Sequence, residues 1–399
     1  MRCRGPSTKV FVVGGSGRVG RVAAKRLAES ELVSEIAIGG RDLAFATRVA
    51  EETGPKATAF KVDATDEKKL AKLAKPYDLI VSTAGPDFRV ALPVTRAAID
   101  AGIAGCDIAA DGPSLEKALA LNKQARDAGV TFVTGIGHTP GISNLLMQHA
   151  ANQLDAVEDV QLCVWWDLGG ENIATFGDPE EMRTTGRVNA SWQTVLTWVT
   201  GPVRTYRDGR LVAVDPFEDA TEVTLPKDGG TVSAVPIGST EPITIPRRIP
   251  GVRSVSIRMA LLPPQLNEIL RENTRRIAEG TANAAAATMA FLDTITADPN
   301  RWLKGREDVP TGFGMMATAI GRKEKRKVRY SCWPAGPWES TVGPLTTAAL
   351  WILQGKVRLR GVIPPEAAFD PIPFLREAAR FRLKSTPTRL LGESVETLP

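Results

Sequence analysis

Cysteine, histidine and long apolar runs are all scarce in this sequence of 399 residues. The four cysteines lie far apart, with no C-x-x-C pair and no spacing typical of zinc, which predicts reduced thiols and no metal site. They are Cys3, Cys106, Cys163 and Cys332. No apolar run is long enough to span a membrane, and the start of the chain has no apolar signal core. We therefore expect a soluble cytoplasmic protein.

An excess of charge of one sign is also lacking. The 50 basic and 45 acidic residues give a net charge of +5, and no long basic stripe runs through the sequence. This balance argues against a nucleic-acid partner. The densest basic run is GRKEKRK at residues 321–327. It could form a phosphate-binding patch, but the solvated end of a hairpin is the favoured interpretation.

Three glycines lie between a predicted strand and a predicted helix near the start of the sequence. The apolar run Lys9–Val13 predicts a buried parallel strand, and Arg21–Glu29 predicts a helix. Between them, Gly15, Gly17 and Gly20 form a G-x-G-x-x-G pattern. In that order, these glycines are expected to permit a tight turn, the approach of a pyrophosphate, and close packing of helix on strand. The predicted cofactor-binding loop consists of Gly15, Ser16, Gly17, Arg18, Val19 and Gly20.

Strands and helices are predicted to alternate through the first third of the chain. After the glycine loop, short apolar runs that read as strands are separated by helical patterns. The predicted strands are 35–38, 58–62, 78–82, 104–108 and 130–134, and the helices are 43–52, 67–74, 89–101 and 114–128, with Asp42 capping the first of these. This alternation indicates an α/β fold, a Rossmann doubly wound parallel sheet that binds its ligands at the carboxyl ends of the strands.

Three strand ends carry candidate cofactor contacts. After the second strand, Arg41 stands near the position where an NAD site usually has an acidic residue, which favours the 2′-phosphate of NADP over a plain surface arginine. Asp63 is a contact for the adenine amino group or a cap of the next turn, with neither interpretation preferred. Ala84, Gly85 and Pro86 are small enough for a cofactor to cross the sheet edge, although an ordinary turn has the same composition.

Two further residues are candidates for catalysis. Asp107 follows the fifth strand, where it could hold a substrate amine, orient water or cap the next helix. His138 lies in the segment GIGHTPGISN at residues 135–144, and it is a candidate proton donor or hydrogen-bond partner, or a satisfied structural histidine. His149, the second of the two histidines, is expected to be packed.

Beyond residue 155 the pattern changes to short strands between turn signals. Strands are predicted at 160–166, 203–207, 211–214, 222–225, 232–235, 242–245, 252–259 and 328–333, and helices at 191–200, 265–278 and 282–295. These indicate a second α+β domain built on a mostly antiparallel sheet. Apolar helices at 343–355 and 371–381 could return to the first domain. The predicted domains are therefore 1–142, 143–340 and 341–399.

The chain resembles the saccharopine dehydrogenase-like NAD(P) oxidoreductases. The resemblance rests on GGSGRVG at 14–20, STAGP at 82–86, CDIAAD at 106–111, GIGHTPGISN at 135–144 and GVIPPE at 361–366. It implies a Rossmann domain, a central substrate and dimerisation domain, a homodimer, and hydride transfer at an imine or amine in amino acid metabolism. Asp107 and His138 would lie near the nicotinamide. Arg183, Arg187 and Arg258 are the candidate clamps for carboxylates of a small-molecule substrate.

Two departures leave the substrate open. Residues 260–265, ALLPPQ, lack the tyrosine and histidine of lysine 6-dehydrogenase-like members, and no aromatic residue precedes Asp107. We therefore keep three functions: an NADP-dependent reductase or dehydrogenase of a C–N bond, a reductase of a C=C bond on a lipid or polyketide-like substrate, and a non-catalytic sensor that binds NADPH.

Overall fold

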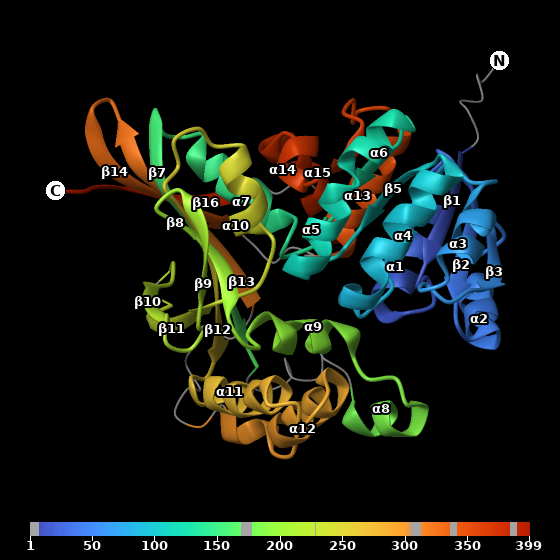
Figure 1. Ribbon diagram of the computed structural model, residues 1–399, viewed down its shortest axis with the longest axis horizontal. Coiled ribbons are helices and arrows are strands. Elements are labelled where there is room, and N and C mark those ends of the chain that lie inside the picture. Colours follow the sequence, from blue (N-terminus) through green and yellow to red (C-terminus); the bar gives the residue numbers. More distant parts are fainter. Residues whose placement is uncertain are drawn as a thin grey trace. The chain divides into compact units, whose positions relative to one another are not determined.

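The computed structural model describes residues 8–168, 178–227, 229–302, 304, 313–335, 341–383 and 389–399. The chain divides into two compact units (Figure 1). The first comprises Met1–Leu145 with Pro337–Leu390, and the second comprises Leu146–Gly336 with Leu391–Pro399. The last nine residues, predicted with a segment that returns to the first domain, thus fall in the second unit.

A parallel sheet of seven strands forms the centre of the first unit. The strands are β1 (Thr8–Val13), β2 (Val33–Gly40), β3 (Ala57–Lys61), β4 (Leu79–Ser82), β5 (Ala104–Asp107), β6 (Thr131–Val133) and β15 (Gly361–Ile363). Their order is β15-β6-β5-β4-β1-β2-β3, and every pairing is parallel. This confirms the predicted doubly wound sheet. The seventh strand, β15, was not predicted.

Helices cover this sheet. They are α1 (Arg18–Ala28), α2 (Leu43–Thr53), α3 (Glu67–Ala74), α4 (Asp87–Ala101), α5 (Gly112–Ala120), α6 (Asn122–Asp127), α13 (Val342–Leu353), α14 (Pro365–Ala368) and α15 (Pro371–Leu383). The helix predicted at 114–128 is wrong as a single element, because α5 and α6 are separate and Leu121 lies between them. One core packs α4 against the sheet through residues such as Phe11, Phe132 and Val94.

Aspartates begin several of these helices. Asp42 accepts a hydrogen bond from the Phe45 backbone N–H, which confirms its predicted role at the start of α2. Asp66 does the same for α3 through the backbone N–H of Lys69. Such caps satisfy N–H groups that the first helical turn leaves without a partner, so they fix where each strand-to-helix connection ends.

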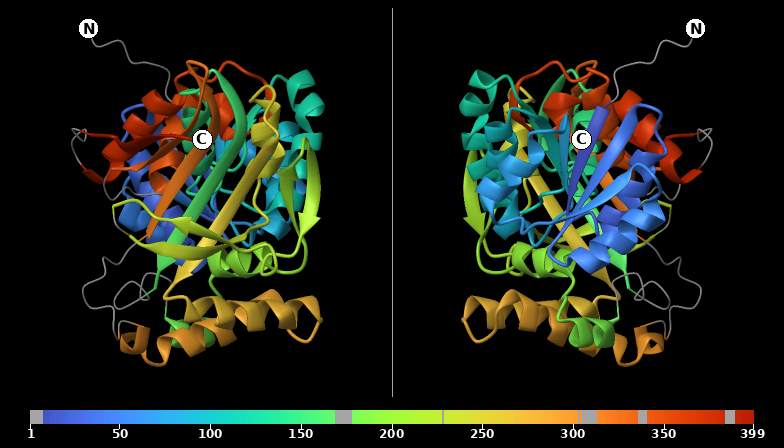
Figure 2. Two further views of the ribbon diagram at one scale, coloured as in Figure 1. Left: turned by 90° about the vertical axis from the view of Figure 1, so that its left-hand side faces the viewer. Right: turned by 90° about the vertical axis from the view of Figure 1, so that its right-hand side faces the viewer.

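The second unit is built on a mixed sheet that is mostly antiparallel (Figure 2). Its strands are β7 (Ala156–Asp167), β8 (Val203–Arg207), β9 (Arg210–Val214), β10 (Thr221–Thr224), β11 (Thr231–Pro236), β12 (Ser254–Leu262), β13 (Phe313–Lys323), β14 (Arg326–Pro334) and β16 (Leu391–Thr397). Only β12 and β7 pair in parallel among the described strands of this sheet. Its helices are α8 (Pro179–Thr185), α9 (Ala190–Trp198), α10 (Glu241–Thr244), α11 (Gln265–Ala278) and α12 (Ala284–Thr296). Helix α7 (Ile142–Ala151) includes the residue at which the first unit ends. The predicted α+β class is confirmed.

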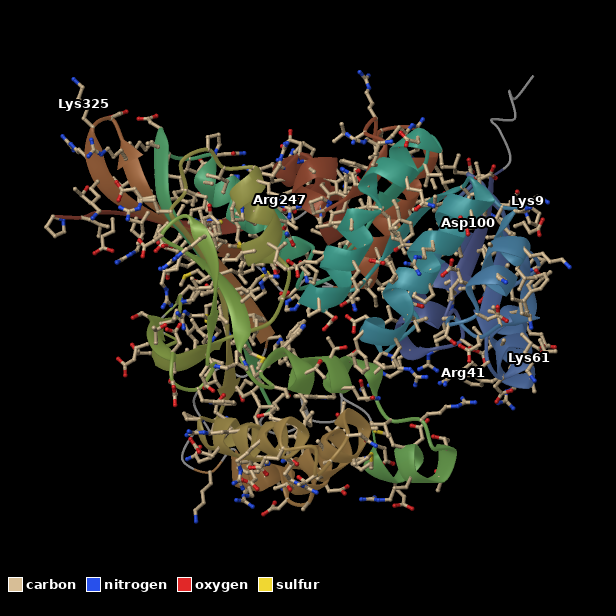
Figure 3. All side chains as sticks on the ribbon, in the orientation of Figure 1. Lys9, Arg41, Lys61, Asp100, Arg247 and Lys325 are labelled. Carbon is tan, nitrogen blue, oxygen red and sulfur yellow. The ribbon has the colours of Figure 1, made fainter. Side chains whose placement is uncertain are left out.

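Two details of the second unit differ from the prediction. Residues 242–245, predicted as a strand, lie mostly in the short helix α10, where Pro242 occupies an early helical position that suits its fixed φ. Strand β13 was not predicted, and it pairs with both β7 and β14. The basic run forms the end of the β13–β14 hairpin, with Lys325 at its tip (Figure 3). Residues 322–327 are exposed, as the solvated-hairpin interpretation predicts.

Within the described ranges, no helix is both long enough and apolar enough to span a bilayer.

Candidate nucleotide-binding and catalytic site

The glycine loop follows β1 at the carboxyl edge of the parallel sheet. Gly14 has a φ of +75°, so the left-handed backbone conformation of the turn falls on Gly14. The sequence analysis had assigned this turn to Gly15. A Cβ added to Gly20 would lie 2.1 Å from the Gly14 carbonyl oxygen and 2.6 Å from Thr83 Oγ1. Any side chain there would push α1 away from the loop, which is the close packing predicted for Gly20.

The start of α1 offers backbone N–H groups without a side-chain cap. Gly17 is the N-cap residue, and no side chain caps it. The Gly17 N–H donates to the Gly14 carbonyl oxygen, and the Gly17 carbonyl accepts from Arg21. Gly17 itself is exposed. The start of the helix can therefore receive an anion such as a pyrophosphate.

The end of β2 lies against the same loop. The Gly39 carbonyl oxygen accepts from the N–H groups of Gly14 and Gly15, at 2.9 and 3.1 Å. A Cβ on Gly40 would lie 2.6 Å from Ser16 Oγ. The absence of a side chain at Gly40 thus lets the loop approach β2, and the exposed Arg41 follows directly (Figure 3).

Asp63 lies close to Arg41 beyond the end of β3. Its Oδ1 accepts from the backbone N–H and the hydroxyl of Thr65, at 2.9 and 2.7 Å, and these bonds are the main reason why its pKa is lowered. The positive charges of Arg41 and Arg89 lower that pKa further. Asp63 therefore does cap its own turn, and its contact with adenine stays a prediction.

Residues 83–86 lie beside the glycine loop. The Thr83 hydroxyl donates to the Gly14 carbonyl oxygen at 3.1 Å, and the Thr83 N–H donates to the Val13 carbonyl oxygen. A Cβ on Gly14 would lie 2.6 Å from the backbone nitrogen of Ala84. The segment with Ala84, Gly85 and Pro86 thus adjoins the site of the predicted pyrophosphate.

Asp107 is the most heavily bonded of the predicted catalytic groups. Its side chain is 2% exposed, and Oδ1 accepts from the Gly135 and Ala109 N–H groups and from the Thr134 hydroxyl. Its other oxygen, Oδ2, has no hydrogen-bond partner among the described residues. Burial raises the pKa of Asp107 to about 6, although the three hydrogen bonds oppose this shift.

The loop that carries His138 is closed on itself. The Gly137 N–H donates to the Pro140 carbonyl at 2.9 Å, and the Gly141 N–H donates to Asn144 Oδ1 at 2.9 Å. Burial lowers the pKa of His138 to about 4, so its ring is neutral at pH 7. Of the predicted roles, this favours a hydrogen-bond partner over a charged proton donor.

The structure adds residues that the sequence did not single out. Asn144 Nδ2 donates to Glu366 Oε2 at 2.9 Å, and both side chains are buried. Asp87 Oδ2 accepts from the N–H groups of Ala110 and Asp111. Both Asn144 and Glu366 belong to motifs that carried the family resemblance, but their contact joins positions 222 residues apart, so no local pattern could reveal it.

The arginines predicted to bind substrate carboxylates all lie in the second unit. Arg258 is 8% exposed and donates to the backbone carbonyl and the carboxylate of Asp219. Arg183 forms ion pairs with Glu180 and Asp293. Arg187 is exposed. Arg183 and Arg258 therefore already contact carboxylates of this chain.

The sheet order, the glycine loop and the start of α1 define a dinucleotide-binding fold of the doubly wound class. Residues 10–133 match the family described as the saccharopine dehydrogenase NADP binding domain. Over these residues the chain is therefore similar to the saccharopine dehydrogenase-like proteins that its motifs resemble.

Known proteins are similar over different lengths. Saccharopine dehydrogenase (L-Glu forming) of Saccharomyces cerevisiae shares the fold, with a TM-score of 0.66 and 15% identity over 98% of this chain and 100% of that one. Carboxyaminopropylagmatine dehydrogenase of a Synechocystis species is 24% identical over 94% of this chain and 96% of its own length. A trans-acting enoyl reductase of Mycobacterium ulcerans is 27% identical over 44% of this chain and 45% of its own length. The match thus spans less than half of the enoyl reductase.

Proposed function

We propose that this chain is an NADP-dependent oxidoreductase that transfers a hydride between the nicotinamide and the C–N bond of an amino-acid-derived imine or amine. The NADP-binding domain family and the narrow packing at Gly14 and Gly20 support binding of the dinucleotide. The full-length similarity to a protein named as a dehydrogenase supports the reaction class.

The unpaired Oδ2 of Asp107 is the observation that carries this proposal. A buried polar atom without a partner is costly, and a catalytic role is one of the reasons why a protein keeps such an atom. A protonated imine carries the positive charge that a buried carboxylate stabilises, and it also supplies an N–H donor. Because the pKa of Asp107 is about 6, the group is mostly ionised at neutral pH and mostly protonated below pH 5.

The remaining residues have supporting roles. When bound, NADPH supplies the hydride. The loop residues Gly15, Ser16, Gly17, Arg18, Val19 and Gly20 hold the pyrophosphate, and Arg41 contacts the 2′-phosphate. Neutral His138 accepts or donates one hydrogen bond near the reacting atoms. Positioning and exclusion of water are the main tasks, since a protonated imine is already electrophilic.

A second candidate function is reduction of a C=C bond. Arg183 and Arg258 already contact carboxylates of the chain, so a substrate carboxylate would have to displace those partners. The similarity to trans-acting enoyl reductases adds to this candidate. An apolar acyl substrate would need no such exchange.

The deciding experiment has two stages. Calorimetric titration with NADPH and NADH measures cofactor binding, and we expect NADPH to bind more tightly. Nicotinamide absorbance then follows turnover with mixtures of amines and keto acids or aldehydes, and separately with an enoyl thioester. Turnover of the imines supports the proposed reaction, and turnover of the thioester alone supports the second candidate. Binding of NADPH without turnover in either panel is the behaviour expected of a sensor.

We also propose that the chain acts in the cytoplasm as a homodimer, as the family resemblance implies. Light scattering coupled to size-exclusion chromatography measures the mass in solution, and a mass near twice 42.8 kDa is the expected result.

A further inference from the structure

A second buried polar atom without a partner follows the strand next to the one that ends at Asp107. Thr139 is 7% exposed, and its hydroxyl has no hydrogen-bond partner in the part of the chain that the structure describes. Asp107 ends β5, and Thr139 lies in the loop after β6, the neighbouring strand. A Cβ on Gly135 would lie 2.8 Å from Pro140 and 3.0 Å from the Ala109 carbonyl, so the two strand ends are in contact. Two unsatisfied atoms therefore belong to one edge of the sheet.

The Thr139 hydroxyl is part of a tightly closed loop. Gly137 and Gly141 form a bridge, and a Cβ on Gly141 would lie 2.2 Å from the Gly137 carbonyl oxygen. The Ser143 N–H donates to the His138 carbonyl, and Asn144 Oδ1 accepts a hydrogen bond from the Gly141 N–H. These bonds hold the backbone on both sides of Thr139, so its hydroxyl can change direction only by rotation of the side chain.

Strand order indicates which ligand comes to this edge. In the order β3-β2-β1-β4-β5-β6, a dinucleotide lies across the carboxyl ends, with its pyrophosphate at the start of α1. Arg41 and Asp63 follow β2 and β3, so the adenosine half belongs to that side. The nicotinamide half then falls to β4, β5 and β6, where Asp107 and Thr139 lie.

We propose that the Thr139 hydroxyl hydrogen-bonds the carboxamide of the nicotinamide and so fixes the orientation of the ring. This inference rests on the proposed NADP binding. The carboxamide carries both a donor and an acceptor, either of which a hydroxyl can satisfy. The second unsatisfied atom, Asp107 Oδ2, can only accept when ionised, and it stays with the substrate nitrogen.

The test compares two ligands that differ in the nicotinamide. Calorimetry is run with NADPH and with the 2′-phosphate of ADP-ribose, which has the adenosine and pyrophosphate but no nicotinamide. Thr139→Val keeps the shape of the side chain and removes the hydroxyl, and Thr139→Ser keeps the hydroxyl. We expect Thr139→Val to weaken NADPH binding about three- to tenfold, to leave the fragment unchanged, and to be rescued by Thr139→Ser.

Thr131→Val is the matched control, because Thr131 begins β6 and its hydroxyl donates to the Leu359 carbonyl instead. Its NADPH affinity should match that of the wild type. Equal loss of both ligands in Thr139→Val would overturn the inference and assign the hydroxyl a structural role. Unchanged NADPH binding would overturn it as well, and would point to a buried water as the missing partner. Failure of the wild type to bind either ligand would instead refute the proposed NADP binding.

Discussion

Arg41 is the residue on which the proposed cofactor preference depends. It is exposed and lies close enough to Asp63 to lower the pKa of that carboxylate. Arg41→Asp should weaken NADPH binding tenfold or more, because a charge-assisted contact with the 2′-phosphate becomes a repulsion, and it should leave NADH binding unchanged or tighter. Calorimetric titration of both cofactors measures this.

Arg48→Asp provides the control for Arg41. Arg48 is also exposed, and its guanidinium lies over the ring of Phe45, 5.4 Å from the ring centroid. The change makes the same alteration of charge, so its effect on NADPH should be small. Equal losses in the two variants would mean that Arg41 acts only through overall charge.

Asp107 should make the stability of the protein depend on pH. Its pKa in the folded protein is about 6, above that of an unfolded aspartate near 4, so the folded state binds more protons between these values. The contribution of Asp107 to stability is therefore fully present below pH 4 and is lost as pH rises through 6. As pH rises from 4 to 7, the free energy of unfolding of Asp107→Asn should therefore increase by about 2 kcal/mol relative to that of the wild type.

Thermal unfolding of both proteins from pH 4 to pH 8 measures this difference. The asparagine Oδ1 can keep the hydrogen bonds from Thr134, Gly135 and Ala109, which makes the variant a close match. A difference in stability that is constant over this range would show that the pKa of Asp107 is not raised.

Single residues could be predicted from the sequence where a local rule applied. Asp42 was found because a cap precedes its helix, and Asp107 because it ends an apolar run. The unsatisfied hydroxyl of Thr139 could not be predicted, since it depends on which atoms the closed loop leaves within reach. The contact between Arg258 and Asp219 could not be predicted either, because the two residues are 39 positions apart in the sequence.

At the scale of elements, the contact between the glycine loop and α1 makes the sharpest prediction. Gly20→Ala would put a methyl group 2.1 Å from the Gly14 carbonyl oxygen, so α1 has to move. We expect a destabilisation of about 1–3 kcal/mol together with a loss of NADPH binding. Gly17→Ala is the matched variant, because its nearest contact would be 3.2 Å away. It should keep most of the stability while still losing affinity for NADPH.

Urea unfolding and calorimetry together distinguish these outcomes. If Gly20→Ala were as stable as wild type and bound NADPH normally, the close packing of α1 on the glycine loop would not be required for either property. If Gly17→Ala bound NADPH normally, the start of α1 would not hold the pyrophosphate.

Elements with regular local patterns could be predicted, and those that depend on distant partners could not. Strands β1 and β4 contain the continuous apolar runs VFVV and LIV, and their parallel pairing follows from the alternation of strands with helices. By contrast, β15 has only three residues and exists because it pairs with β6, more than 200 residues earlier. Residues 242–245 were predicted as a strand because Ile243, Thr244 and Ile245 are β-branched, although a proline near the first turn also suits a helix.

At the scale of the whole molecule, the chain forms each unit from two separate stretches. The second unit is completed by β16, which pairs with β14 over seven residues at the edge of the sheet. Side chains reinforce this pairing, since the Tyr330 hydroxyl donates to Glu393 Oε1 at 2.6 Å and His149 Nε2 lies 3.3 Å from the same oxygen. His149 is thus packed, as predicted, and buried at 9% exposure.

This arrangement predicts that removal of residues 391–399 damages one unit and spares the other. The deletion leaves the edge of β14 unpaired and the Tyr330 hydroxyl without its carboxylate, so the second unit should unfold at a lower temperature and aggregate more readily. The proposed contacts to NADPH, from the loop at residues 15–20 through Arg41 to Thr139, all lie in the first unit. Calorimetry on freshly purified, soluble protein should therefore give an NADPH affinity within about twofold of wild type.

The variants Glu393→Ala and Val395→Thr measure how much side-chain contacts of β16 contribute to the stability of the second unit. Glu393→Ala keeps the strand but removes the side-chain contacts with Tyr330 and His149, and we expect a loss of about 1 kcal/mol. Val395 is 59% exposed, so Val395→Thr should change little and serves as the control on the same strand. If the deletion abolished NADPH binding while the first unit stayed folded by hydrogen exchange, the cofactor would require the second unit. The assignment of the whole dinucleotide site to the first unit would then be wrong.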